Sequence, residues 1–253
     1  MRRHEWINEF RAAGRAKSVG TMGAIYLIRH GQASFGKSDY DQLSEVGFTQ
    51  SRVLGEALRS RVPKPDAVLS GAMRRHRETA ETCLAAMQTP IPMKVVDAPG
   101  FREYDHDEIV VRFKPEYADH AFRLADMARH ANPRRAFQEM FTQAISRWVS
   151  GKHGAEYKES WPAFRARCTQ ALEDTIRLLG PSKTALVFTS GGPITAIAQN
   201  LLQIPDEQAF GLNWTLANCG VTKVIYSERG KYLASLNEHA HFEGDKRELI
   251  TYR

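Results

Sequence analysis

The chain has 253 residues, of which 42% are hydrophobic and 25% charged, and its formal net charge is +6. This composition is that of a globular protein with a sizeable core, and it excludes a chain too polar to fold. The positive charge favours anionic ligands, but the sequence has no zinc-finger spacing and no basic run interleaved with aromatic residues, so we expect no nucleic-acid binding.

The cysteines and the apolar runs indicate the compartment. The three cysteines, Cys83, Cys168 and Cys219, are widely spaced and form no C-x-x-C pair, which is typical of a reducing environment. No apolar run approaches the roughly 20 residues of a membrane-spanning helix. We therefore expect a cytoplasmic protein that does not associate with a membrane.

Residues 1–22 precede the first apolar run and lack the apolar core of a secretory signal. One interpretation is an amphipathic arm with Trp6, Ile7 and Phe10 on one side. The sequence favours a simpler one, which is a disordered extension or a start of translation at Met22. The remainder, 23–253, contains no linker and is expected to form a single domain.

Short apolar runs then alternate with amphipathic helices. Ser44 caps one predicted helix, and a second is expected from near Met73 to about Met87. The first strand is expected to be buried on both faces because its run is continuous. Strands are expected at 24–28, 66–70 and 93–98. This alternation predicts a three-layer α/β/α fold with a mostly parallel central sheet.

Residues 104–160 interrupt this rhythm. They are charged and read as helical, with a clear helix start at Asn132-Pro133, so we interpret them as an inserted helical cap. The next helix is expected to begin at Ser160 and to end at Gly180-Pro181.

A strand at 185–188 leads into the turn Thr189-Ser190-Gly191-Gly192, and Pro193 reads as the first residue of the helix that follows. Backbone N–H groups at such a helix start form an anion site. The runs 220–227 and 231–237 flank a glycine turn and predict a hairpin.

Four candidate sites follow strands of the predicted sheet. Because ligands bind at the carboxyl edge of such sheets, we expect these residues to lie close together. They are Arg29-His30-Gly31, Arg75, Glu103 and Ser190-Gly191-Gly192. Each alone has a plain structural explanation, such as a solvated helix face for Arg75 or a surface charge for Glu103. Together they suit a phosphoryl group: arginines bind its oxygens, a histidine can accept it covalently, and a carboxylic acid can protonate the leaving oxygen.

The motifs resemble those of the histidine phosphatase superfamily, whose fold is that of phosphoglycerate mutase. Six blocks occur in the family's order: YLIRHGQAS, LSEVGFTQSRVLGEAL, SGAMRRHRETA, FREYD, KESWPAFRAR and SLNEHAHF. The resemblance covers about residues 24–243. It implies that His30 is the nucleophile that becomes phosphohistidine and that Glu103 is the acid–base residue. It also implies that Arg29 and Arg75 bind phosphate together with Gly191.

One position departs from the family. Its fourth block reads S-H-G, whereas this chain has Thr189-Ser190-Gly191, so the second catalytic histidine of the family falls on Ser190. Serine can donate one hydrogen bond but cannot carry charge. Losing one donor aimed at developing charge costs about 3–4 kcal/mol. The resemblance therefore implies a phosphatase of reduced activity.

Other histidines could compensate for Ser190. His106 lies three residues beyond Glu103 and is the strongest candidate to face the phosphate as an accessory residue, while His76 is expected to be a surface or packing residue. His239 and His241 could suggest a metal, but no third ligand is evident at a suitable spacing, so we expect no metal and no cofactor.

We therefore expect hydrolysis of a phosphate monoester, on a small molecule or a phosphopeptide, through a phosphohistidine intermediate. Two alternatives stay open: phosphoryl transfer of the phosphoglycerate mutase type, and a phospho-ligand-binding protein without catalysis. A mutase needs further basic groups in the cap, and the sequence does not orient those present. The oligomeric state is also open, with a homodimer as one alternative.

Overall fold

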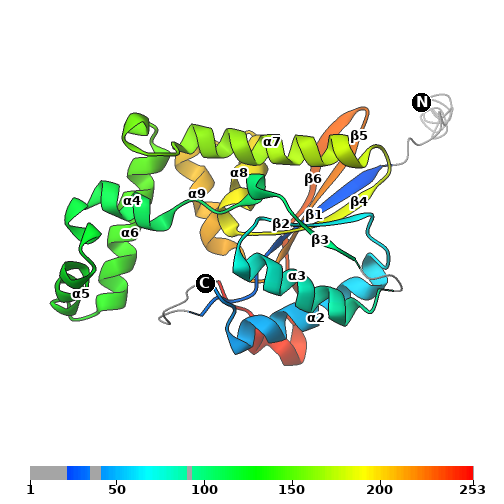
Figure 1. Ribbon diagram of the computed structural model, residues 1–253, viewed down its shortest axis with the longest axis horizontal. Helices are drawn as coiled ribbons and strands as arrows, with labels where there is room; N and C mark the ends of the chain where they lie inside the picture. The colour runs from blue at the N-terminus through cyan, green and yellow to red at the C-terminus, as the bar shows by residue number, and fades with distance from the viewer. Residues whose placement is uncertain (1–21, 35–40, 90–92, 253) are drawn as a thin grey trace, which may run out of the picture.

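The computed structural model describes residues 22–34, 41–89 and 93–252, so the expected extension lies, apart from Met22, outside the described residues. A six-stranded sheet in the order β3-β2-β4-β1-β5-β6 forms its centre (Figure 1). The first four strands in this order run parallel, whereas β5 and β6 form an antiparallel hairpin. The strands are β1 (Gly23–Arg29), β2 (Ala67–Ser70), β3 (Val95–Asp97), β4 (Thr184–Thr189), β5 (Val221–Ser227) and β6 (Gly230–Glu238). The expected three-layer fold with a mostly parallel sheet is thus confirmed.

Strand β1 is buried on both faces, as its continuous apolar run predicts. Ile25 and Leu27 enter one hydrophobic core, and Tyr26 and Ile28 enter the other. Successive side chains of a strand point to opposite faces, so a strand between two helical layers must be apolar at every position. Strand β4 follows the same rule, which makes these two strands the centre of the molecule.

Helices cover both faces of the sheet. Figure 1 shows α7 crossing one face together with α8 and α9, while α2 and α3 lie on the other face beside the C-terminal segment. The Ser44 hydroxyl caps α2 by accepting from the Gly47 N–H, as its position before the helix predicts. The helices of these layers are α2 (Glu45–Arg61), α3 (Arg74–Met87), α7 (Trp161–Leu179), α8 (Gly191–Leu202) and α9 (Asp206–Thr215).

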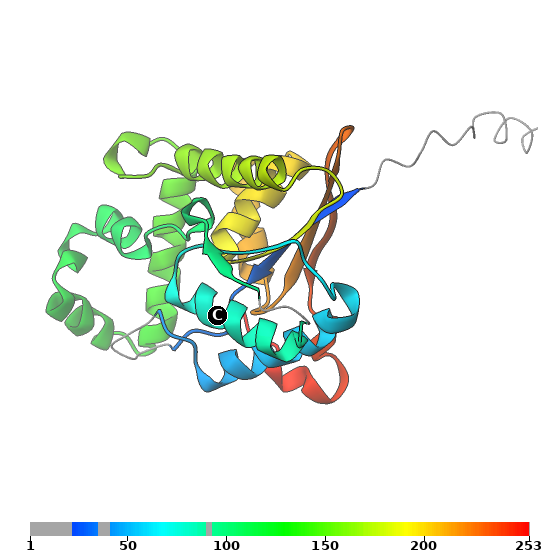
Figure 2. The ribbon, with the colours of Figure 1, turned by 45° about the vertical axis from the view of Figure 1, so that its right-hand side comes forward.

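The segment between β3 and α7 contains the helices α4 (His106–Phe113), α5 (His120–Ala128) and α6 (Pro133–Val149). Figures 1 and 2 show that they stand to one side of the sheet, beyond the ends of its strands. Trp148 and Ile145 of α6 belong to the same core as β1 and α7, so the cap is joined to the body through continuous packing.

Helix α8 begins at Gly191, two residues earlier than the expected start at Pro193. Ser190 has an extended backbone, with φ −119° and ψ 176°, and stands at the N-cap position. The first four N–H groups of a helix have no intrahelical acceptor, so a proline as the third residue removes no hydrogen bond and cannot mark the start uniquely. The N–H groups that have no acceptor within this helix therefore begin at the glycines themselves.

Candidate active site

Strands β1, β2 and β4 end side by side, which brings the loops that follow them together. Arg29 at the end of β1 is in register with Thr189 at the end of β4, and Ser70 of β2 is in register with Phe188. The His30 N–H donates to the Thr189 carbonyl at 2.8 Å, which extends the ladder one residue into the site. The structure thus places the candidate residues of the three loops at one edge of the sheet.

His30 is buried, with 7% of its surface exposed, and its ring orientation is set locally. Nδ1 lies 2.7 Å from the carbonyl oxygen of Gly31. A carbonyl can only accept, so Nδ1 carries the hydrogen and the lone pair of Nε2 is left for chemistry. Burial, and after it the charges of Arg75 and Arg29, hold the pKa of His30 well below its usual value. The ring is therefore neutral near pH 7.

Arg29 and Arg75 bring two guanidinium groups to His30 from different elements. Arg29 Nη1 donates to the carbonyls of Leu216 and Tyr252, the latter at 3.0 Å, so the C-terminal segment holds this side chain. Arg75, at the start of α3, is 3% exposed, and its Nη1 donates to Asp41 Oδ1 at 2.7 Å. A buried charge needs a partner, and Asp41 supplies one from a position that the sequence did not single out.

Glu103 enters the site after the short 3₁₀ turn η1 (Pro99–Phe101) that follows β3. Its Oε2 accepts from the Gly192 N–H at 3.2 Å, and its Oε1 accepts from the Tyr104 N–H at 3.2 Å. Burial raises the pKa of Glu103, while the positive charge of Arg75 and these N–H groups oppose the shift only in part. A raised pKa favours the protonated form, which is the form that a proton donor needs.

The loop that carries Glu103 is fixed by the motif KESWPAFRAR. Arg167 of α7 makes two hydrogen bonds to the carboxylate of Glu159, at 2.7 and 2.8 Å. The same guanidinium donates to the carbonyls of Gly100 and Arg102 at 2.9 and 3.0 Å. Backbone carbonyls of a short turn that have no partner within it need donors, and Arg167 provides them within η1 and directly after it.

The glycine turn has no room for side chains. A Cβ atom at Gly192 would collide with the Glu103 carboxylate, and one at Gly191 would collide with Oδ1 of Asn213. The N-terminus of α8 is therefore in direct contact with the catalytic carboxyl candidate. Ser190, Gly191 and Gly192 are all buried, so their polar groups are shielded from bulk water.

His76 was expected to be a surface or packing residue, and the structure places it in the interior, in contact with Ser190. The side chain is 0% exposed, and its Nε2 lies 2.6 Å from Ser190 Oγ. Its ring centroid is 5.6 Å from that of His30. No local sequence signal identifies His76, because its partner lies 114 positions further along the chain. Its position directly after Arg75 was the one available hint.

His106, the expected accessory residue, begins α4 on the cap side of the site. Burial, and after it the charge of Arg75, lower the pKa of His106 to about 4. The ring packs 4.4 Å from that of Tyr104 and stacks on Phe141 at 5.9 Å. Phe141 in turn contacts Trp214 at 6.3 Å. His106 is thus one of four aromatic rings in successive contact, which we call the aromatic wall: Tyr104, His106, Phe141 and Trp214.

The C-terminal segment closes the site from the side of β5. The Asn218 side chain donates to the His30 carbonyl at 3.0 Å and accepts from the Thr251 hydroxyl at 2.9 Å. Gln50, from the block LSEVGFTQSRVLGEAL, donates to the Leu249 carbonyl and accepts from the Gln32 N–H. These contacts give that block a structural function, which is to join the loop after His30 to the end of the chain.

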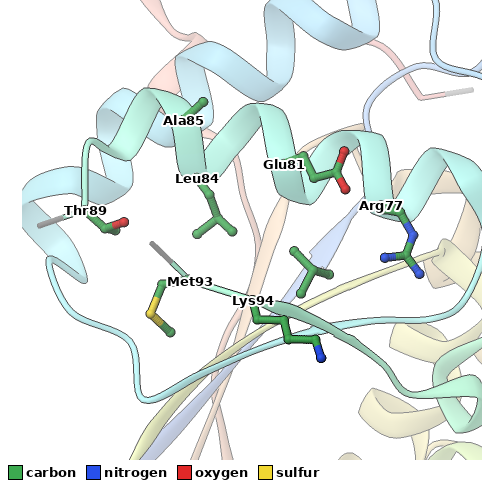
Figure 3. A pocket seen from close by; sticks show the side chains of 8 residues that line it. Arg77, Glu81, Leu84, Ala85, Thr89, Met93 and Lys94 are labelled. Carbon is green, nitrogen blue, oxygen red and sulfur yellow. The ribbon is translucent and has the colours of Figure 1, made fainter. Parts of the chain in front are cut away.

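Outside the site around His30, we searched the described residues for a metal site, a membrane-spanning helix and a further hollow. Within 22–34, 41–89 and 93–252, no group of three or more histidine, cysteine or acidic side chains could hold a metal ion, and no helix is long and apolar enough to cross a bilayer. A hollow between α3 and β3, lined by Arg77, Glu81, Leu84 and Met93 among others, lies away from His30 (Figure 3).

Comparison with known proteins matches residues 25–239 to the model of the histidine phosphatase superfamily, branch 1. No curated protein matches the chain.

Among solved structures, a phosphoglycerate mutase from Bacillus anthracis is similar at 17% identity and a TM-score of 0.61, with 88% of this chain and 96% of that one covered. A mutant phosphoserine phosphatase from Entamoeba histolytica, in complex with phosphoserine, has 18% identity, a TM-score of 0.59 and coverage of 87% and 98%. A mycobacterial glucosyl-3-phosphoglycerate phosphatase has 20% identity, a TM-score of 0.58 and coverage of 86% and 100%. At these identities the likeness establishes the fold.

Proposed function

The chain belongs to the histidine phosphatase superfamily, branch 1, and on that basis we propose that it hydrolyses phosphate monoesters through a phosphohistidine formed on His30. The observation that carries this proposal is the state of His30. Its Nδ1–H donates to the Gly31 carbonyl, and burial, followed by the charges of Arg75 and Arg29, keeps the ring neutral, so the lone pair of Nε2 is available as a nucleophile.

In the first half-reaction, the phosphoryl group moves from the substrate to His30. Arg29, Arg75 and the N-terminus of α8 bind the oxygens of the phosphoryl group. The lone pair of His30 Nε2 forms a bond to phosphorus as the ester P–O bond breaks. The leaving oxygen takes the proton of Glu103, whose raised pKa keeps that proton available.

The second half-reaction regenerates the site. The Glu103 carboxylate takes a proton from a water molecule, and the water oxygen bonds to phosphorus. The N–P bond to His30 then breaks and inorganic phosphate leaves. Each group returns to its starting protonation state, so the same residues serve the next turnover.

The aromatic wall, to which the cap and Trp214 of α9 both contribute, supports a leaving group with an apolar or aromatic part. Trp214 keeps 39% of its surface exposed and stands in contact with Phe141, which stacks on His106. Exposed aromatic faces beside a phosphate site gain free energy by covering apolar groups of a ligand. We therefore infer that aryl or otherwise apolar phosphate esters are bound in preference to small polar ones.

The mutase alternative receives no support from the basic residues of the cap. A twice-phosphorylated intermediate needs cations that face the site, but four of the six basic residues considered in the cap pair with carboxylates of the cap itself. The six residues are Arg112, Lys114, Arg123, Arg129, Arg134 and Arg135. These pairs are Arg112–Glu108, Lys114–Asp126, Arg123–Asp107 and Arg135–Glu139.

The decisive experiment compares the wild type with His30→Ala on p-nitrophenyl phosphate, and traps the intermediate by acid-sensitive, base-stable phosphorylation of the protein. We expect turnover and a phosphoprotein with the wild type and neither with His30→Ala. His130→Leu, which removes an exposed imidazole of the cap, is the control and should behave as the wild type. Equal rates for wild type and His30→Ala would refute the proposal in favour of a non-catalytic binder, and turnover of 3-phosphoglycerate to its isomer would favour the mutase.

A further inference from the structure

His76 and Ser190 form a buried pair next to the nucleophile, and the proposed mechanism leaves this pair without a function. His76 reaches the site from α3, Ser190 stands at the N-cap position of α8, and their Nε2 and Oγ atoms are 2.6 Å apart. Both side chains are 0% exposed. A polar contact of this kind, wholly removed from water, is retained only where its members satisfy one another or a ligand.

We propose that Ser190 and His76 together supply the hydrogen-bond donor to the phosphoryl oxygens that the family resemblance assigns to one histidine at position 190. The Ser190 hydroxyl touches the phosphoryl group, and His76 is a positioning residue that orients this hydroxyl. The inference rests on the proposed function, because it concerns the same anion site.

The first argument for this proposal is the number of hydrogen bonds that the Ser190 hydroxyl can make. A hydroxyl has one hydrogen to donate and two lone pairs to accept with. Arg75 Nη2, which can only donate, lies 3.4 Å from Ser190 Oγ and takes one lone pair. If His76 donates its Nε2–H to the other lone pair, the hydroxyl hydrogen is released for a third direction. The buried neighbourhood of Ser190 holds the N-terminus of α8, where an anion binds.

The second argument concerns which ring nitrogen of His76 bears the hydrogen. With its hydrogen on Nδ1, the ring would accept from Ser190 and draw the hydroxyl hydrogen away from the phosphoryl group. With a hydrogen on Nε2, the ring donates and the serine can donate onward. A bound anion stabilises only the second arrangement, so binding selects it. Burial, and after it the charges of Arg75 and Arg102, lower the pKa of His76, so the neutral ring carries one hydrogen in either arrangement, and the ring of His30 lies beside it. The Gly71 carbonyl, on the Nδ1 side of the ring, favours the first arrangement while no anion is bound, so the bound anion must shift the hydrogen to Nε2.

The third argument is the space available around Ser190. The imidazole of His76 stands in contact with the Ser190 side chain inside a core with no exposed surface. A histidine placed at position 190 would need the volume that His76 occupies. One imidazole therefore serves this part of the site, and in this chain it is supplied from α3 instead of from the turn after β4.

The pair can be tested by a double-mutant cycle of His76→Leu, Ser190→Ala and the double variant. The readouts are kcat for p-nitrophenyl phosphate and calorimetric binding of orthovanadate, which resembles the transition state. We expect each single change to lower kcat by about 10²- to 10³-fold with a smaller effect on KM, since this is what a donor to developing charge contributes. The double variant should be no worse than the more damaged single variant. Losses that multiply, or a His76→Leu enzyme with unchanged kcat and vanadate affinity, would overturn the inference.

A relocation experiment separates positioning from mere packing. Ser190→His alone should lose activity because His76 occupies the space, whereas His76→Ala combined with Ser190→His should exceed both His76→Ala and Ser190→His in kcat. Thermal unfolding checks that each variant is folded. If the relocated variant is folded yet no better than either single change, one imidazole does not replace the other and the inference fails. If it does not fold, the cycle above decides alone. Vanadate binding needs no turnover, so it reads the pair even if His30→Ala shows that the proposed function is wrong.

Discussion

Replacing Glu103 with glutamine removes the proposed proton donor while preserving its shape. The two carboxyl oxygens accept hydrogen bonds from the N–H groups of Gly192 and Tyr104. The amide of glutamine has one oxygen in place of two, so one of these hydrogen bonds is lost. The lost hydrogen bond should lower the free energy of unfolding by about 1–3 kcal/mol, which leaves the fold intact. Loss of general acid catalysis should lower kcat by about 10²–10⁴, or about 3–5 kcal/mol in the barrier at about 1.36 kcal/mol for each tenfold change.

The size of the loss should depend on the leaving group. A p-nitrophenolate leaves without much help, whereas an alkoxide needs a proton, so we expect Glu103→Gln to reduce turnover of an alkyl phosphate far more than turnover of p-nitrophenyl phosphate. The assay is steady-state kinetics with both esters on both proteins. Equal losses with the two esters would refute the assignment of Glu103 as the acid.

The pH dependence follows from the same residue. His30 has a lowered pKa and must be neutral to attack, so this requirement is met from acidic pH upward. Glu103 has a raised pKa and must be protonated, so activity should fall as the pH rises through that pKa. The optimum is therefore expected on the acidic side of neutrality. The substrate titrates as well, but equally for wild type and Glu103→Gln, so a falling limb of the same shape in the variant would contradict the reasoning.

Three further changes test the surroundings of the site. Arg75→Lys keeps the charge but loses the planar fork, so KM for p-nitrophenyl phosphate should rise by about 5- to 100-fold, the equivalent of about 1–3 kcal/mol for a charged hydrogen bond; an unchanged KM would remove Arg75 from the phosphate site. Arg167→Leu frees the carbonyls of Gly100 and Arg102, so it should lower kcat and the melting temperature with little effect on phosphate affinity, which product inhibition measures. Trp214→Ala should raise KM for aryl phosphates and leave phosphoserine nearly unaffected, and a parallel change in both would argue against the aromatic wall as the selective surface.

The sequence predicted the strands and helices well because their signals are local. The continuous apolar run of β1 requires burial on both faces, and Ser44, Asn132 and Ser160 each cap the helix expected to follow them. The start of α8 was misplaced by two residues, since glycines carry no side-chain signal and Pro193 is tolerated anywhere in a first turn.

The carboxyl ends of parallel strands meet, and from this rule alone the sequence indicated that the loops after β1, β2 and β4 share one site. What it did not determine is which side chains complete that site. Asp41 pairs with Arg75 from 34 positions away, and His76 pairs with Ser190 from 114. Neither spacing corresponds to a helical or strand period, because both contacts are made between separate elements. Tertiary packing decided that His76, expected to be a surface or packing residue of α3, stands beside the nucleophile, because the start of α3 and the start of α8 meet at the same sheet edge and bring its Nε2 within hydrogen-bonding distance of the buried Ser190 hydroxyl.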